Sequence, residues 1–181
     1  MSRIPPVNPE QLSPEQRKIY DAIAAGPRGR VVGPFLALLH APELTNRVQQ
    51  LGEYLRYKTG FTPALNELAI IVTARHNNAP YEFHAHALLA LAAGVSQRIV
   101  DAVAARRRPE SMDPDQALVH DYALEINVTR TASDDIYAKV LQRFGTTGIV
   151  ELTVLCGYYT LMAMTLNAHQ VPLPEGVKPA W

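Results

Sequence analysis

The stretch ELAIIVTARHNNAPYEFHAHALLALAAG, residues 67–94, decides the fold of this protein. Its first half begins at Glu67 and is apolar on almost every side, which is typical of a helix buried all round. The polar NNA turn ends that helix, and Pro80 suits the first position of the next one. This second helix carries Glu82 and His86 four residues apart, so both side chains lie on one helix face. Three titratable groups can therefore meet in one pocket, and this is the strongest functional signal in the sequence.

Helix signals recur along the whole chain, and no alternating strand pattern of useful length interrupts them. Ser13 and Asp113 each precede a proline and begin a capping-box pattern. Pro42 predicts the start of one helix and Gly145 the end of another. These signals predict an all-α protein with helices at about 13–25, 35–40, 42–59, 62–76, 80–93, 96–104, 113–128, 133–144 and 147–168.

Two finer patterns add to this prediction. ELAII at residue 67 and ELTVL at residue 151 open two apolar helices in the same style. This echo indicates either two related helical halves or a chance similarity between two apolar helices. In the helix after Pro42, apolar residues at helical spacing form a predicted inward stripe: Leu44, Val48, Leu51 and Leu55.

Length and charge limit the domain organisation and the classes of partner. A chain of 181 residues fits one domain, which we place at 13–170 between an N-terminal arm at 1–12 and a C-terminal tail at 171–181. The 17 basic and 17 acidic residues balance, so no electrostatic footprint for nucleic acid or an anionic membrane is expected. The run Arg106–Arg108 is therefore interpreted as a solvated helix end.

The sequence also indicates the compartment. No apolar segment is expected to span a membrane, because none approaches about 20 residues, and the N-terminus lacks an apolar signal-peptide core. The single cysteine, Cys156, excludes an intramolecular disulfide and a CxxC pair, and we interpret it as a small core residue. These features predict a cytoplasmic protein.

Three segments resemble the carboxymuconolactone decarboxylase family: ELAIIVTAR from residue 67, YEFHAHALLALAAGVS at 81–96 and VELTVLCGYYTLMAMTLNA at 150–168. The segments RGRVVGPFLALLHAPEL and LRY are similar to the longer members of this family. The resemblance covers about residues 14–172 and implies the all-α alkylhydroperoxidase D-like fold. It also implies a small-molecule substrate and a homo-oligomer, either a trimer or a hexamer, in which the tail ending in Trp181 is expected to be a docking arm.

The peroxidase branch of this family uses a CxxCxxxH motif, with a glutamate upstream in a proton relay. His86 matches the histidine of that motif, and Glu67 matches the relay glutamate. Ala79 and Glu82 stand at the two cysteine positions, and neither residue can supply a thiolate. An alkylhydroperoxidase-like antioxidant activity is therefore disfavoured.

The decarboxylase branch is the better match, and it implies acid–base chemistry with no cofactor because a carboxylated unsaturated lactone carries its own electron sink. The resemblance then implies that His86 donates a proton while Glu82 or Glu67 orients the imidazole. The same trio also suits proton abstraction, lactone isomerisation or water activation. The substrate-binding candidates are Arg56 and Arg30, either of which can anchor a carboxylate, and Tyr81.

Each candidate also has a simpler interpretation. Glu82 and His86 can form an ordinary helix pair, and Glu67 can be a first-turn acid that complements the helix dipole. His84 lies about 200° around the helix from His86 and is expected to face elsewhere. A metal site formed by the same trio is a competing hypothesis, but no metal is expected because strong metal signatures bring more histidines. A helical oligomer that binds a small apolar ligand without catalysis is the non-enzyme alternative.

Overall fold

Proline begins most of the helices of this protein. The computed structural model describes residues 2–181, which contain one short 3-10 helix, eight α-helices and no strand. Six of these α-helices have proline at their first position, where its missing N–H would have had no intrahelical partner. The predicted all-α class is confirmed. The elements are η1 (Pro9–Gln11), α1 (Pro14–Ala25), α2 (Pro34–Leu38), α3 (Pro42–Tyr57), α4 (Pro63–His76), α5 (Pro80–Ala92), α6 (Gln97–Ala104), α7 (Pro114–Thr129) and α8 (Asp134–Ala168).

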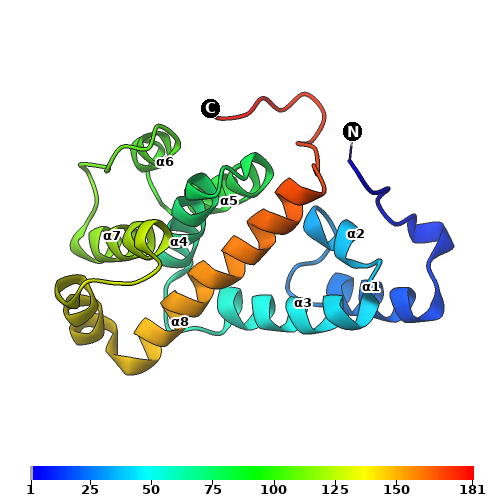
Figure 1. Cartoon of the computed structure of the whole chain (residues 1–181), viewed down its shortest axis with the longest axis horizontal. Helices are drawn as coiled ribbons and strands as arrows, with labels where there is room; N and C mark the ends of the chain where they lie inside the picture. Colours follow the sequence, from blue (N-terminus) through cyan, green and yellow to red (C-terminus); the bar gives the residue numbers. More distant parts are fainter. Residues whose placement is uncertain (1) are drawn as a thin grey trace.

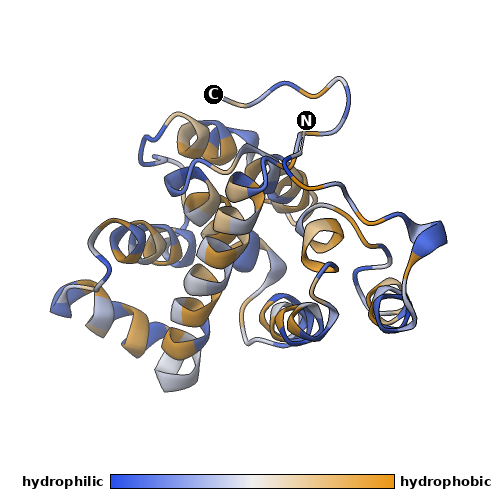
Figure 2. Ribbon diagram, turned by 45° about the vertical axis from the view of Figure 1, so that its right-hand side comes forward, coloured by the Kyte–Doolittle hydropathy of each residue, from blue (hydrophilic) through white to orange (hydrophobic). Residues whose placement is uncertain are grey.

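Helix α4 lies at the centre of the fold and packs against α5, α7 and α8 (Figure 1). Ten of its 14 residues are buried, so the prediction that this helix is buried is confirmed. Figure 2 shows hydrophobic residues recurring on one side of the surrounding helices, as expected of helices that cover a core. Because neighbours pack around α4, a polar side chain on this helix is held in one position.

Helix α8 consists of two helical segments joined at Gly145. This residue has φ +70° and ψ 178°, which interrupts the helix. Glycine adopts positive φ at no steric cost, so the predicted boundary between two helices at Gly145 is confirmed. The segment after the break crosses the molecule diagonally in Figure 1 and contributes one wall of the cavity described below.

The same helix is long and apolar enough, by length and composition, to cross a membrane, which the sequence analysis did not expect. In its most apolar window 56% of the residues are buried inside the protein. The helix packs against α4, α5 and α7, and a helix in the core of a protein has the same apolar composition. Burial in the core therefore accounts for the apolar residues on the inner face of α8.

Helix α3 buries a different face from the predicted one. Leu44 and Leu51 are 52% and 43% exposed, so the predicted stripe is wrong for these two residues. The buried face is instead centred between Val48 and Gly52, and Leu44 and Leu51 lie on its flank. The residues of α3 that are buried are Thr45, Val48, Gln49, Gly52 and Leu55.

The two ends of the chain meet beside the end of α8. The backbone N–H of Arg3 donates to the carbonyl of His169 over 2.8 Å, while Met1, the first residue of the predicted arm, lies outside the described residues. The tail after α8 contains no helix. It turns back over α5, where the Trp181 ring packs edge-on against Phe83 with centroids 5.1 Å apart. This contact of the predicted docking arm is made within the chain.

Candidate active site

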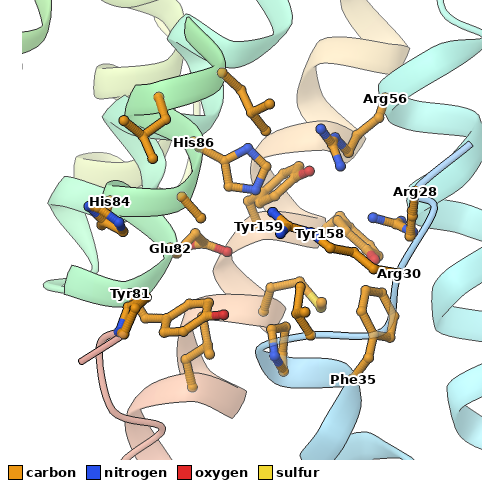
Figure 3. A pocket seen from close by; sticks show the side chains of 18 of the residues that line it. Arg28, Arg30, Phe35, Arg56, Tyr81, Glu82, His84, His86, Tyr158 and Tyr159 are labelled. Carbon is orange, nitrogen blue, oxygen red and sulfur yellow. The ribbon is translucent and has the colours of Figure 1, made fainter. Parts of the chain in front are cut away.

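A cavity of about 520 Å³ lies between α5, α8 and the loop that precedes α2 (Figure 3). In Figure 3, Glu82 and His86 project from α5 toward Tyr158 and Tyr159 of α8, and Arg28, Arg30 and Arg56 lie on the opposite side. Aliphatic side chains of α5 and α8 complete the lining. A volume of this size is within the range of small-molecule sites, roughly 300–1,000 Å³.

Glu67 binds His86 through the Nδ1 side of the imidazole ring. The imidazole Nδ1 lies 2.6 Å from Glu67 Oε2, and the other carboxylate oxygen accepts from Arg56 Nη2 at 3.3 Å. The three side chains are only 9–14% exposed. Glu67 is the fifth residue of α4, beyond the first turn, so it does not serve as a first-turn acid. Because Nδ1 is bound to the carboxylate, His86 presents Nε2 to the cavity for proton transfer.

The charge state of Glu67 follows from its partners. Burial by itself would raise the pKa of this carboxyl group, but the positive charge and hydrogen bond of His86, followed by those of Arg56, lower the pKa below its ordinary value of 4.5. Glu67 is therefore ionised at neutral pH. A carboxylate in this place favours the imidazole tautomer with a proton on Nδ1 and stabilises the imidazolium when it forms.

Glu82 has the opposite charge state. Its residue is 3% exposed, and its Oε2 is buried without a hydrogen-bond partner among the described residues. Burial raises the pKa of Glu82 well above its ordinary value, which favours the protonated, uncharged form of the group. Two carboxyl groups of one site thus differ in role, because Glu67 is an ionised acceptor and Glu82 is a neutral acid that can donate a hydrogen bond.

Two tyrosines of α8 form the wall that faces α5. The rings of Tyr159 and His86 meet edge to face, with centroids 4.9 Å apart. Burial raises the pKa of Tyr158 to about 12 and that of Tyr159 well above its ordinary value. Both hydroxyl groups therefore remain neutral donors. The Tyr158 hydroxyl lies directly against Gly52 of α3, in a space that any larger side chain would fill.

The arginines leave donors unpaired. Arg28 Nε and Nη2 and Arg56 Nε are buried and have no hydrogen-bond partner among residues 2–181. The Arg28 guanidinium lies beside the Tyr158 hydroxyl, and its proximity partly offsets the rise in the pKa of that hydroxyl caused by burial. The described part of the chain has six buried polar side-chain atoms without a hydrogen-bond partner, and five of them belong to residues that line the cavity. These five are the three arginine nitrogens, Glu82 Oε2 and the Tyr158 hydroxyl oxygen. Each such atom costs about 1–3 kcal/mol unless a ligand or water satisfies it.

The structure brings the predicted site residues together. The cavity is lined by the predicted residues Arg30, Arg56, Tyr81, Glu82 and His86, and Glu67 lies directly behind His86. The sequence left open which acid orients the imidazole, and the hydrogen bond identifies Glu67.

Arg28, Tyr158 and Tyr159 also line the cavity and were not among the predicted site residues. The triplet RGR at 28–30 was the available signal for Arg28, and both of its arginines line the cavity. His84 belongs to the lining too, yet Figure 3 shows its ring directed away from the cavity centre.

The site contains no thiol pair and no cluster of metal ligands. Cys156, the single cysteine of the chain, is buried, and burial raises the pKa of its thiol to about 12. Such a group stays protonated and is not the thiolate that peroxide reduction requires. Within residues 2–181, no three histidine, cysteine or acidic side chains come together as metal ligands would.

Part of the chain matches a known protein family. Residues 42–114 match the carboxymuconolactone decarboxylase family. The chain carries a carboxymuconolactone decarboxylase family segment. This segment contains Arg56, Glu67, Glu82 and His86, so the resemblance seen in the sequence is confirmed over the residues that form the centre of the site.

Solved structures share the fold of the family segment and of the helices around it. An alkylhydroperoxidase AhpD core, an uncharacterized peroxidase-related protein from Ralstonia eutropha JMP134, has a TM-score of 0.82 at 19% identity, with 96% of this chain and 93% of that chain covered. A peroxidase-related protein from Silicibacter sp. TM1040 has a TM-score of 0.79 at 14% identity, covering 96% and 92%.

A variant of the debrominase Bmp8 in complex with 2,3,4-tribromopyrrole has a TM-score of 0.73 at 12% identity, with 97% of this chain and 95% of that chain covered. At these identities the likeness establishes the alkylhydroperoxidase D-like fold alone. No curated protein matches the sequence.

Proposed function

We propose that this protein is a cofactor-independent carboxy-lyase that acts on a small carboxylated lactone, or a closely similar unsaturated acid, by general acid–base chemistry. The observation that supports it most is the group of buried, unpaired donors that converges on one cavity beside His86. Buried donors without partners favour a ligand that accepts hydrogen bonds and carries negative charge. A carboxylated lactone provides a carboxylate and a carbonyl oxygen.

The reaction requires the movement of one electron pair and one proton. The bond between a ring carbon and its carboxylate breaks, CO2 leaves, and the electron pair passes into the conjugated lactone carbonyl. Protonated His86 then delivers a proton from Nε2 to carbon, and solvent restores that proton. In sum, one proton is consumed and one CO2 is released, so the reaction needs neither an oxidant nor a reductant.

Each side chain has a separate task in this mechanism. Arg28 and Arg56 offer guanidinium N–H groups to the substrate carboxylate, which Arg30 meets first at the exposed edge of the cavity. The neutral acid of Glu82 and the hydroxyl of Tyr158 donate to the lactone oxygen as it becomes negative. Because these donors are already fixed by packing, they need little reorganisation when charge develops.

The proposal is tested by measuring turnover of carboxymuconolactone by the loss of its ultraviolet absorbance, together with CO2 release. His86→Ala should abolish turnover, whereas His40→Ala, which removes an exposed imidazole outside the cavity, should not change it. Absorbance change without CO2 would indicate isomerisation or hydrolysis at the same site. Binding of the lactone without turnover would identify a non-catalytic binding protein, and turnover that persists in His86→Ala would refute the assigned role.

A parallel measurement separates this activity from that of the peroxidase branch. An organic hydroperoxide is supplied with a thiol reductant, and its consumption is followed with and without protein. No consumption above background is expected, because the chain has one cysteine and its thiol stays protonated and buried. Hydroperoxide turnover would contradict the argument from the missing cysteine pair.

We also propose that the protein works as a homo-oligomer. The outward face of α8 carries apolar residues at the spacing of a helix–helix seam, and they are 40–61% exposed in the single chain. An apolar helix face of this length favours contact with a second copy. The residues of this seam are Val150, Val154, Leu161 and Met164.

A further inference from the structure

We propose a second ligand site, for a small phosphate-bearing molecule with an apolar body, in a separate cavity where the C-terminal ends of α4, α6 and α7 meet. It does not share a lining residue with the proposed active site. It includes the run Arg106–Arg108, which the sequence analysis interpreted as a solvated helix end and which the proposed reaction does not use.

The lining of this cavity combines an aliphatic surface with basic side chains. The volume is about 280 Å³, close to the lower end of small-molecule sites. Four lining residues are aliphatic and six are basic, and none of the described residues that line it is acidic. The aliphatic residues are Val72, Val103, Leu124 and Val128, and the basic ones are Arg75, His76, Arg106, Arg107, Arg108 and His120.

The positive charge in the cavity is only partly neutralised. Asp121 pairs with Arg108, and its Oδ1 lies 2.8 Å from His120 Nδ1. Arg75 and Arg106 are instead held together by a neutral group, because Asn78 Oδ1 accepts from Arg75 Nη1 and from Arg106 Nη2, each at 2.9 Å.

No acidic side chain among residues 2–181 forms an ion pair within 4.0 Å of Arg75, Arg106 or Arg107. Arg75 and Arg106 thus meet at one neutral acceptor without a counter-ion, and Arg107 lines the same cavity.

Helix dipoles do not account for this concentration of charge. Each of the three helix ends provides roughly half a negative charge, about 1.5 in total, whereas the three unpaired arginines provide 3 positive charges. The excess positive charge contributes to the pKa shifts of neighbouring basic groups. Burial, followed by the charges of Arg130 and Arg106, lowers the pKa of His76, and burial followed by the charge of Arg106 lowers the pKa of Arg75.

The chemistry of the lining selects the class of ligand. A phosphate group carries close to two negative charges at neutral pH, and its oxygens match the paired N–H groups of arginine. The aliphatic side chains give an apolar body a surface to bury. The small volume restricts that body to about one ring. Inorganic phosphate would neutralise the charge of the arginines but would leave the aliphatic side chains of the cavity exposed to water.

The protein has a built-in reporter for this site. Trp181 is the only tryptophan of the chain, and the Arg75 guanidinium lies 4.1 Å from the centroid of its ring. A ligand that binds Arg75 changes the electrostatic environment of that indole, so tryptophan fluorescence reports binding here.

Phenyl phosphate is the probe, titrated into the full-length protein at low ionic strength, with calorimetry to count the sites. Inorganic phosphate is titrated in parallel.

The test variant is Arg106→Asn combined with Arg107→Gln. Asparagine is chosen at position 106 because this residue has φ +54°, a region that asparagine tolerates. The matched control is Arg47→Gln combined with Arg98→Gln, which removes the same charge from two exposed positions outside the cavity. Circular dichroism establishes that each variant is folded.

We expect a saturable fluorescence change with phenyl phosphate and weaker binding of inorganic phosphate. The test variant should raise Kd by about tenfold or more, as the loss of charged hydrogen bonds implies, while the control pair should leave it unchanged. No saturable change in the wild-type protein, an equal loss in the control pair, or calorimetric binding without a fluorescence change would overturn the proposal. Equal affinity for inorganic phosphate would overturn the apolar part of the assignment.

Discussion

Glu67→Gln provides the most direct test of the His86 arrangement. The substitution keeps the shape of the side chain and removes its charge. In the wild-type protein the carboxylate lies 2.6 Å from His86 Nδ1 and is only 9% exposed, so water screens the interaction weakly. A neutral amide can still bond to the imidazole, but it no longer stabilises the positive charge that His86 carries before it donates its proton.

The size of the effect follows from the charge-assisted hydrogen bond that a neutral amide cannot make. A hydrogen bond to a charged partner contributes about 1.5–3 kcal/mol, and each 1.4 kcal/mol corresponds to about a tenfold change in rate. Glu67→Gln should therefore lower kcat/KM for the lactone by about 10- to 150-fold. The Glu67–Arg56 contact is longer, at 3.3 Å, so a smaller share of the effect is expected to pass through Arg56.

The measurement is steady-state turnover of carboxymuconolactone, compared between wild type, Glu67→Gln and His86→Ala. Glu53→Gln is the matched control, because it makes the same chemical change in a surface ion pair, 2.8 Å from Lys58, and should leave kcat/KM unchanged. If Glu67→Gln keeps wild-type kcat/KM while His86→Ala is inactive, His86 needs no orienting acid and the reasoning is wrong.

Three further predictions concern stability and assembly. Burial raises the pKa of Glu82 in the folded protein, so as pH rises this carboxyl group loses its proton first in the unfolded chain. This ionisation lowers the free energy of unfolding at pH values above the ordinary pKa of glutamate. Glu82→Gln should therefore leave Tm unchanged near pH 4 and raise it at pH 8, by about 2–4 °C for each kcal/mol gained in the free energy of unfolding. A difference in Tm between variant and wild type that is the same at both pH values would contradict this. Gly52→Ala would place a Cβ directly against the Tyr158 hydroxyl, so overpacking should lower the free energy of unfolding measured by calorimetry by about 1–3 kcal/mol. The higher helix propensity of alanine reduces this loss, and a net gain in stability would contradict the prediction. Val154→Asp with Leu161→Asp should lower the mass measured by light scattering to that of one chain, with helix content retained; an unchanged mass would remove α8 from the interface.

The sequence contained enough information for the centre of the site. Both Glu67 and His86 lie on helices whose apolar composition and starting prolines were clear in the sequence, and the turn between those helices is short. Two helices joined in this way pack side by side and antiparallel, so residues at similar distances from the turn face each other. The charge states of Glu67 and Glu82 were not predictable, because they depend on burial and on partners from other elements.

The remaining parts of the site depend on contacts that periodicity does not encode. The Arg28 guanidinium lies against Gly52 of α3 where it lines the cavity, and nothing local to RGR indicates that contact. The face of α3 was predicted from hydrophobicity alone, yet packing buries Thr45 and Gln49 and leaves Leu51 on the flank. The basic run at 106–108 gains its significance only when α4 brings Arg75 beside it.

The burial of the only thiol has a consequence for where this protein can work. A thiol-based catalyst is oxidised once per cycle and depends on a partner to reduce it again, so its output follows the redox state of the cell. In the proposed reaction His86 loses one proton to the substrate and regains one from water, and Cys156 stays shielded in the core. The protein should therefore retain its activity under oxidising conditions and in the presence of alkylating reagents.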